Sequence, residues 1–240
     1  MLDLLKANFS RAFRGARFYV SVGIMLFVAG VDLFMSHRHG FGIDDQFMDG
    51  SSFMSLLVPL VAGMFISRDY TNNTIRNKII VGHSRVNIYL ANLITAIAIG
   101  FALTLINLIP TLGIGIPLLG WGDADMDKVW ICMGMMFLLT VVHAAFVTFM
   151  CMTMQGISGT VLSFVAYYVV SLVASIVLAF NSDNELGKLI IDALPDFQFS
   201  QLTSVGELPE RLNRFPLYSC GLIAVFTGAG LGIFHRADIK

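Results

Sequence analysis

Long apolar runs recur from one end of this sequence to the other. About 20 mainly apolar residues, each rising 1.5 Å along a helix, span the hydrocarbon core of a bilayer. Six segments approach or exceed that length, and the second of them is the shortest. The pattern predicts an all-α, polytopic membrane protein with six transmembrane helices, at residues 18–35, 52–67, 88–119, 129–154, 160–181 and 217–235.

The composition agrees with a membrane protein. Apolar residues make up 56% of the 240 residues and charged residues only 13%. A soluble domain has roughly a quarter of its residues charged. Most of the outer surface must therefore face something other than water. Since no repeat or linker divides the chain, we expect a single transmembrane domain over residues 1–240.

The third run contains Pro110 and Pro117 near its far end. Proline removes a backbone donor and kinks or breaks a helix. We therefore expect residues 108–120 to be kinked or partly re-entrant, with protein covering the free backbone groups.

Residues 1–17 precede the first run and carry apolar side chains at helical spacing, with Lys and Arg between them. Leu2, Leu5, Phe9 and Phe13 form the apolar series. Such a segment is typical of an amphipathic helix lying in the membrane interface. A water-exposed extension of the first span is the alternative.

The distribution of positive charge predicts the orientation. Cytoplasmic loops of membrane proteins are enriched in Lys and Arg. With both termini in the cytoplasm, ten of the fifteen Lys and Arg residues fall in inner segments. We therefore expect a multi-pass protein of the cell membrane with cytoplasmic N- and C-termini and an outer segment at residues 182–216.

The inner loop between the second and third spans carries a short helix pattern. Thr71 or Asn72 can cap that helix, and Gly82 can end it. We expect an apolar stripe on one face and basic side chains facing away, the stripe formed by Ile75, Ile79 and Ile80 and the basic side chains by Arg76 and Lys78. A rigid helix between two spans can dock in a partner's groove and move both spans. An ordinary basic loop on lipid headgroups is the alternative.

This loop resembles the corresponding loop of ABC-2-type transporter permeases, particularly the small ones of bacteriocin, peptide-toxin and antibiotic export or immunity systems. Their loop has an acidic residue after the second span, then a stretch similar to GTIRNKL, a glycine, Ser-Arg and Tyr. This chain has RDY at 68–70, NTIRNKII at 73–80, Gly82, SR at 84–85 and Tyr89. It departs from the pattern at Asn73, where the family has Gly, and at Asn92, where the family has Lys. The resemblance extends to the plan of the whole chain.

The resemblance implies a permease subunit with no cofactor of its own, driven by a separate cytoplasmic ABC ATPase that binds ATP and Mg²⁺. In agreement, the sequence has no GxxxxGK[ST] phosphate loop. The implied assembly contains two ATPases and a second permease, identical or homologous, in the lipid bilayer, with no nucleic acid. It also implies a coupling helix within residues 69–85, whose ATPase-coupling residues are Asp69, Thr74, Ile75, Arg76, Lys78, Ile79, Gly82 and Arg85.

Polar residues within spans are candidates for a translocation path, since burying them in a membrane is costly. Asp32, Asn107 and His143 are the candidates, each of which can line the path or bridge helices. Scarce intramembrane charge favours an amphipathic peptide or lipophilic compound over an ion as cargo. We also expect residues 185–194 to form a helix in the outer interface or dipping back into the membrane.

Two other function classes stay open. Residues 156–159, GISG, match the GxSG signature of rhomboid-type intramembrane serine proteases, with Ser158 as nucleophile. Catalysis would require a base within hydrogen-bond reach of that serine, yet Ser158 falls in a predicted cytoplasmic turn. A secondary transporter would show paired repeats or ionisable residues in mid-span, and neither stands out.

Overall fold

The computed structural model describes residues 1–43, 53–122, 125–180, 185–202 and 212–237, and every regular element in these ranges is helical. The long helices are α2 (Ala16–His39), α4 (Met54–Thr71), α6 (Arg85–Leu119), α7 (Met126–Met154), α8 (Ile157–Phe180) and α11 (Phe215–Arg236). The short ones are α1 (Leu2–Phe13), α5 (Thr74–Ile80), α9 (Glu185–Asp192), α10 (Pro195–Gln201) and the 3₁₀ turn η2 (Leu212–Arg214).

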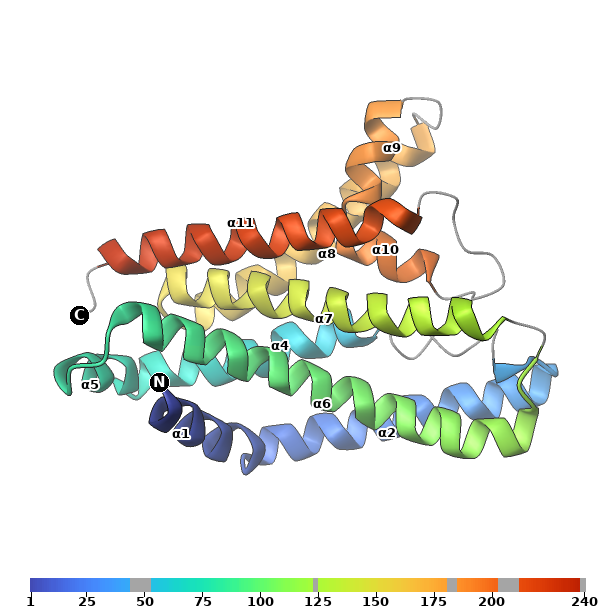
Figure 1. Cartoon of the computed structure of the whole chain (residues 1–240), viewed down its shortest axis with the longest axis horizontal. Helices are drawn as coiled ribbons and strands as arrows, with labels where there is room; N and C mark the ends of the chain where they lie inside the picture. Colours follow the sequence, from blue (N-terminus) through green and yellow to red (C-terminus); the bar gives the residue numbers. More distant parts are fainter. Residues whose placement is uncertain (44–52, 123–124, 181–184, 203–211, 238–240) are drawn as a thin grey trace.

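The long helices form an elongated bundle in which successive helices run in alternating directions (Figure 1). Helix α8 leaves the bundle towards α9, which projects from it (Figure 1). Helices α1 and α5 lie at one end of the bundle, together with the N-terminus and the end of α11 (Figure 1). We call this the α1/α5 end. The predicted inner segments 1–17 and 69–85 therefore share an end with the last residues of the final span.

Helix α7 lies at the centre and packs against α4, α6, α8, α10 and α11, while α2 packs on α6. Small residues allow this close packing. A Cβ atom at Gly63 of α4 would lie 2.7 Å from the Thr160 side chain of α8. A Cβ atom at Gly100 of α6 would overlap Thr140 of α7.

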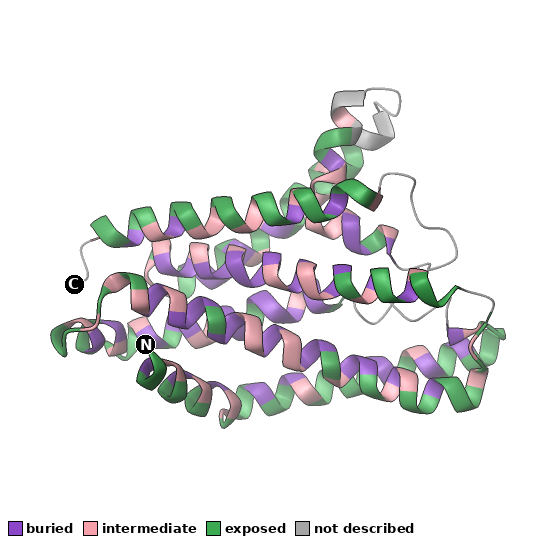
Figure 2. Ribbon diagram, in the orientation of Figure 1, coloured by how far each residue is buried: buried purple, intermediate pink, exposed green. Residues whose placement is uncertain are grey.

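Among the described residues, five helices are long and apolar enough to cross a membrane, namely α2, α6, α7, α8 and the 212–236 segment that contains α11. Figure 2 shows exposed residues along the outer sides of the helices. Large apolar residues are among the exposed ones, including Phe27, Trp130, Leu172 and Val225. Many large exposed apolar side chains on apolar helices are typical of contact with lipid. The chain is therefore a helical protein of the multi-pass membrane type. Helix α4 overlaps the predicted span 52–67 but is not among the five helices.

Residues 108–119, for which the sequence predicts a kinked or partly re-entrant segment, belong to one continuous helix. Helix α6 continues through Pro110 and Pro117 and ends at Leu119, before Gly120. In an apolar environment the helix is retained because any other backbone path leaves more polar groups unpaired than two prolines do. Near the second proline, Gly115 leaves room for α2, since a Cβ atom there would lie 2.9 Å from the Leu33 side chain.

Helix α1 covers most of the predicted interfacial segment and turns into α2 at Gly15. The side chains it buries against the bundle are Leu4, Asn8 and Ala12. The predicted series Leu2, Leu5, Phe9 and Phe13 lies beside them and is exposed or half-buried. The face of α1 that packs on the bundle is therefore not the predicted apolar series. It contains Asn8, whose side chain bonds to polar groups of the bundle that are described below.

Candidate functional site

A buried carboxylate in the last turn of α4 organises the α1/α5 end. Asp69 accepts two hydrogen bonds from Arg11 of α1, at 2.6 Å and 3.2 Å. It accepts a third from Lys78 of α5, at 2.8 Å. The side chains of Asp69 and Lys78 are only 3% and 9% exposed, whereas that of Arg11 is 40% exposed. One acid therefore joins three helices through two cations.

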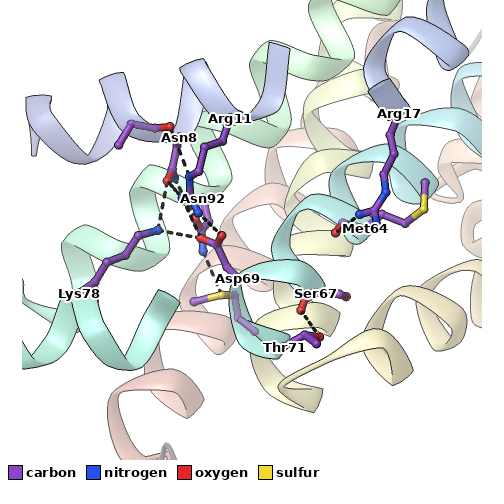
Figure 3. A network of polar contacts seen from close by, with 11 residues as sticks. Asn8, Arg11, Arg17, Met64, Ser67, Asp69, Thr71, Lys78 and Asn92 are labelled. Carbon is purple, nitrogen blue, oxygen red and sulfur yellow. Dashed lines mark hydrogen bonds and ion pairs between the residues drawn. The ribbon is translucent and has the colours of Figure 1, made fainter. Parts of the chain in front are cut away.

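Two amides extend this cluster into the bundle (Figure 3). The Asn8 side-chain oxygen accepts from Arg11 at 2.7 Å and from Lys78 at 3.1 Å. The Asn8 nitrogen donates to Asn92 of α6 at 2.9 Å. The Asn92 nitrogen lies 3.4 Å from the Met152 sulfur of α7. The polar network of Asn8, Arg11, Asp69, Lys78 and Asn92 thus ties α1, α4, α5 and α6 together.

Burial affects the Lys78 ammonium of this network. Desolvation lowers the pKa of Lys78 below its ordinary value, and the neighbouring Asp69 carboxylate opposes that shift. A buried ion is tolerated only where its partners replace its hydration. Here the side-chain oxygen of Asn8 accepts a hydrogen bond from each of the two cations. The network therefore holds α5 in one position, and it requires each of these groups to keep its place.

The short predicted helix within 69–85 is present as α5, but its caps differ from the prediction. Neither Thr71 nor Asn72 is its N-cap; that position is Asn73, at a φ of 53°, without a side-chain cap bond. Asparagine tolerates the left-handed conformation better than most residues. Gly82 follows the helix at a φ of 98°, as predicted for a residue that ends it.

The predicted faces of α5 are partly wrong. Ile75 is buried and Ile79 is half-buried, as expected, but Ile80 is 71% exposed. Lys78 was expected to face away, yet it points into the bundle. Residues 75, 78 and 79 share one helical face, and Asp69 supplies the charge that makes this face acceptable to a lysine. Arg76 is exposed, as expected.

The remaining predicted coupling residues have separate positions. Thr74 is half-buried at the start of α5. Arg85 begins α6 and donates to the carbonyls of Phe234 at 3.0 Å and His235 at 3.3 Å, and also to that of Ala237. Arg85 therefore holds the end of α11 to the start of α6, because a cation satisfies the last carbonyls of a helix.

The three predicted path residues are not gathered in one site. Asp32 is half-buried in α2. Asn107 is buried in α6, and its side-chain oxygen has no hydrogen-bond partner within the described residues. His143 lines a cavity of about 550 Å³ between α7, α8, α9 and α11, whose lining includes neither Asp32 nor Asn107.

His143 also bridges two helices. In the neutral tautomer, its Nδ1–H donates to the Leu139 carbonyl at 2.7 Å and its Nε2 accepts from the Tyr167 hydroxyl of α8 at 2.6 Å. The Tyr167 oxygen lies 3.4 Å from Asp196 of α10. These contacts satisfy the imidazole, so His143 bridges α7 and α8 whether or not it lines a path.

Ser158 lies in the first turn of α8 and is exposed, and its hydroxyl donates to the Met154 carbonyl at 3.4 Å. The adjacent Gly159 has a packing reason, because a Cβ atom there would lie 2.5 Å from the Cys151 Cα. Close approach of α7 and α8 therefore accounts for one glycine of the GxSG match. No histidine bonds to Ser158 in the part of the chain that the structure describes.

Sequence reasoning did not identify Asn8, Arg11 or Asn92 as site residues. The available signal was weak: Asn8 is a polar residue within a helix that has an apolar face, and Asn92 departs from the family that the loop resembles.

No protein-family model matches this sequence, and neither does any curated protein.

Proposed function

We propose that this chain is the permease subunit of an ABC-type exporter that moves an amphipathic peptide or lipophilic compound out of the cell. ATP is bound and hydrolysed by a separate cytoplasmic subunit. The proposal includes six spans, with α4 as the sixth, and both termini in the cytoplasm. The coupling residues are those of the 69–85 loop.

The observation that carries the proposal is that α5 is anchored to the bundle on one side and has exposed apolar side chains on the other. Its inner face is anchored by Ile75 and by the pair between Lys78 and Asp69. Beyond that face it presents Ile80 and Val81, which are 71% and 77% exposed, beside the exposed Arg76. Such apolar side chains beside a cation suit a groove on a soluble partner.

The anchoring makes α5 suitable for transmitting force. Force applied to its outer face reaches α4 through Asp69 and α6 through the Asn8–Asn92 contact. Because Asn8 also bonds to Lys78, helix α1 moves with α5. Closure of an ATPase dimer could therefore shift these helices as one body, a rigid-body transition of the kind seen in switching proteins.

The test is co-purification of this chain with a cytoplasmic ABC ATPase subunit from the cells that express both. We expect Arg76→Glu to abolish recovery of the ATPase while the permease still inserts into membranes. Arg38→Glu, at an exposed arginine at the end of α2, is the matched control and should retain the ATPase. Full recovery with Arg76→Glu, or a purified chain that needs no nucleotide-hydrolysing companion, would contradict the proposal.

A further inference from the structure

A pocket of about 550 Å³ lies beside the network, where α1 turns into α2 against α4. Four arginines line it: Arg11, Arg14, Arg17 and Arg68. They come from three helices or their junctions, so the fold gathers charges that are up to 57 positions apart in the sequence. The volume lies within the roughly 300–1,000 Å³ of typical ligand pockets.

The positive charge of this pocket is not balanced by acidic side chains among the described residues. Asp69 is the one acid in its lining, and Asp69 is already paired with Arg11 and Lys78. Both ion pairs found among the described residues involve Asp69, so neither Arg14 nor Arg68 has a carboxylate partner there. Within the part of the chain that the structure describes, Arg17 donates to the Met64 carbonyl at 3.4 Å and has no ion pair. The pocket therefore suits an anion.

One part of the pocket wall is apolar. Phe18, Val61, Phe65 and Ile99 contribute to the lining, and the Arg11 guanidinium lies 5.7 Å from the centre of the Phe65 ring. Basic side chains above apolar ones match a molecule with an anionic head and a hydrocarbon tail. The pocket also lies where α2, a candidate span, begins. That depth corresponds to the headgroup region of a bilayer.

We propose that this pocket binds the phosphodiester headgroup of an anionic phospholipid, with part of an acyl chain against the apolar wall. Arginine forks bind phosphate oxygens in pairs, and basic pockets beside spans bind anionic headgroups. The bound lipid braces α1 against α4, next to the Asp69 network. This inference requires a membrane protein but does not depend on the ATPase-driven function.

The experiment is native mass spectrometry of the full-length protein released from nanodiscs that contain equal amounts of phosphatidylglycerol and phosphatidylcholine. We expect the wild type to retain phosphatidylglycerol selectively. Arg14→Ala/Arg68→Ala removes two pocket arginines outside the Asp69 network and should lower that retention by about tenfold or more, because charge-assisted hydrogen bonds are lost. Arg236→Ala, at an exposed arginine of the same end outside the pocket, is the control and should retain the lipid.

Melting temperatures provide a second measurement. Phosphatidylglycerol should raise the melting temperature of the wild type more than that of Arg14→Ala/Arg68→Ala, relative to phosphatidylcholine alone. Equal lipid retention by the double variant and Arg236→Ala would overturn the proposed site. Equal stabilisation by inorganic phosphate in phosphatidylcholine would overturn the assignment to a lipid, since the pocket would then take a free anion.

Discussion

The carboxylate of Asp69 and the ammonium of Lys78 lie 2.8 Å apart and join the last turn of α4 to α5, with both side chains almost fully buried. Because nine positions separate the two residues, the pair closes the turn around Asn73. This contact gives a seven-residue helix a defined position, although a helix of that length has little stability by itself.

Asp69→Asn should destabilise the protein by about 3 kcal/mol, since breaking a buried ion pair leaves a charge without compensation. Asp3→Asn, an exposed acid on α1, is the control and should have little effect. The measurement is thermal unfolding of the purified chain in detergent.

Lys78→Met provides the second half of a double-mutant cycle. Asp69→Asn/Lys78→Met should be more stable than Asp69→Asn alone, because no buried ammonium is left unpaired and the half-exposed Arg11 can turn to water. A double variant whose loss equals the sum of the two single losses would show that the pair is not coupled.

Asn92→Ala should cost about 1–3 kcal/mol, because the Asn8 amide nitrogen loses its acceptor in a buried position. Thermal unfolding beside Asn77→Ala, at an exposed asparagine of α5, measures the difference. Equal melting temperatures for the two variants would mean that the contact between α1 and α6 does not contribute to stability.

Gly159→Ala should destabilise the protein by roughly 1–3 kcal/mol, because its Cβ atom would meet the backbone of α7 at 2.5 Å and 2.7 Å. Gly156→Ala, at a position with open space, should be tolerated.

Ser158→Ala should leave both stability and export unchanged. Loss of function in Ser158→Ala with normal stability would favour the protease interpretation instead.

Cysteine labelling on intact cells tests whether α4 crosses the membrane. In a Cys220→Ser background, an impermeant maleimide should label Arg38→Cys from outside and Arg76→Cys only after the membrane is opened. Both positions are exposed, and α4 lies between them in the chain. Labelling of both from the same side would exclude a crossing by α4 and therefore six spans.

The long helices could be predicted because each depends on local hydrophobicity. The apolar runs at 129–154 and 217–235 correspond to α7 and α11 within three residues at each end. The continuity of α6 through its prolines could not be predicted in this way. Whether a proline breaks a helix depends on what surrounds it, and a kinked or re-entrant path was equally compatible with the sequence.

The polar network could not be predicted because its members are distant in sequence. Asn8 and Asn92 are 84 positions apart, and Arg11 and Asp69 are 58 apart. Lys78 appeared to belong to the solvent face because lysine rarely lies in a core without a partner. Its partner Asp69 is the acidic residue of the loop motif, but the sequence does not show that the turn at Asn73 brings Asp69 and Lys78 together.

Photo-crosslinking from α5 tests the central claim most directly. A benzoylphenylalanine at Ile80, on the exposed end of α5, should crosslink to the ATPase subunit in intact membranes, and nucleotide trapping should alter the yield. The same probe at Leu217, exposed near the start of α11 at the other end of the bundle (Figure 1), should not. Crosslinking from Leu217 but not from Ile80 would place the ATPase at the wrong end and contradict the account.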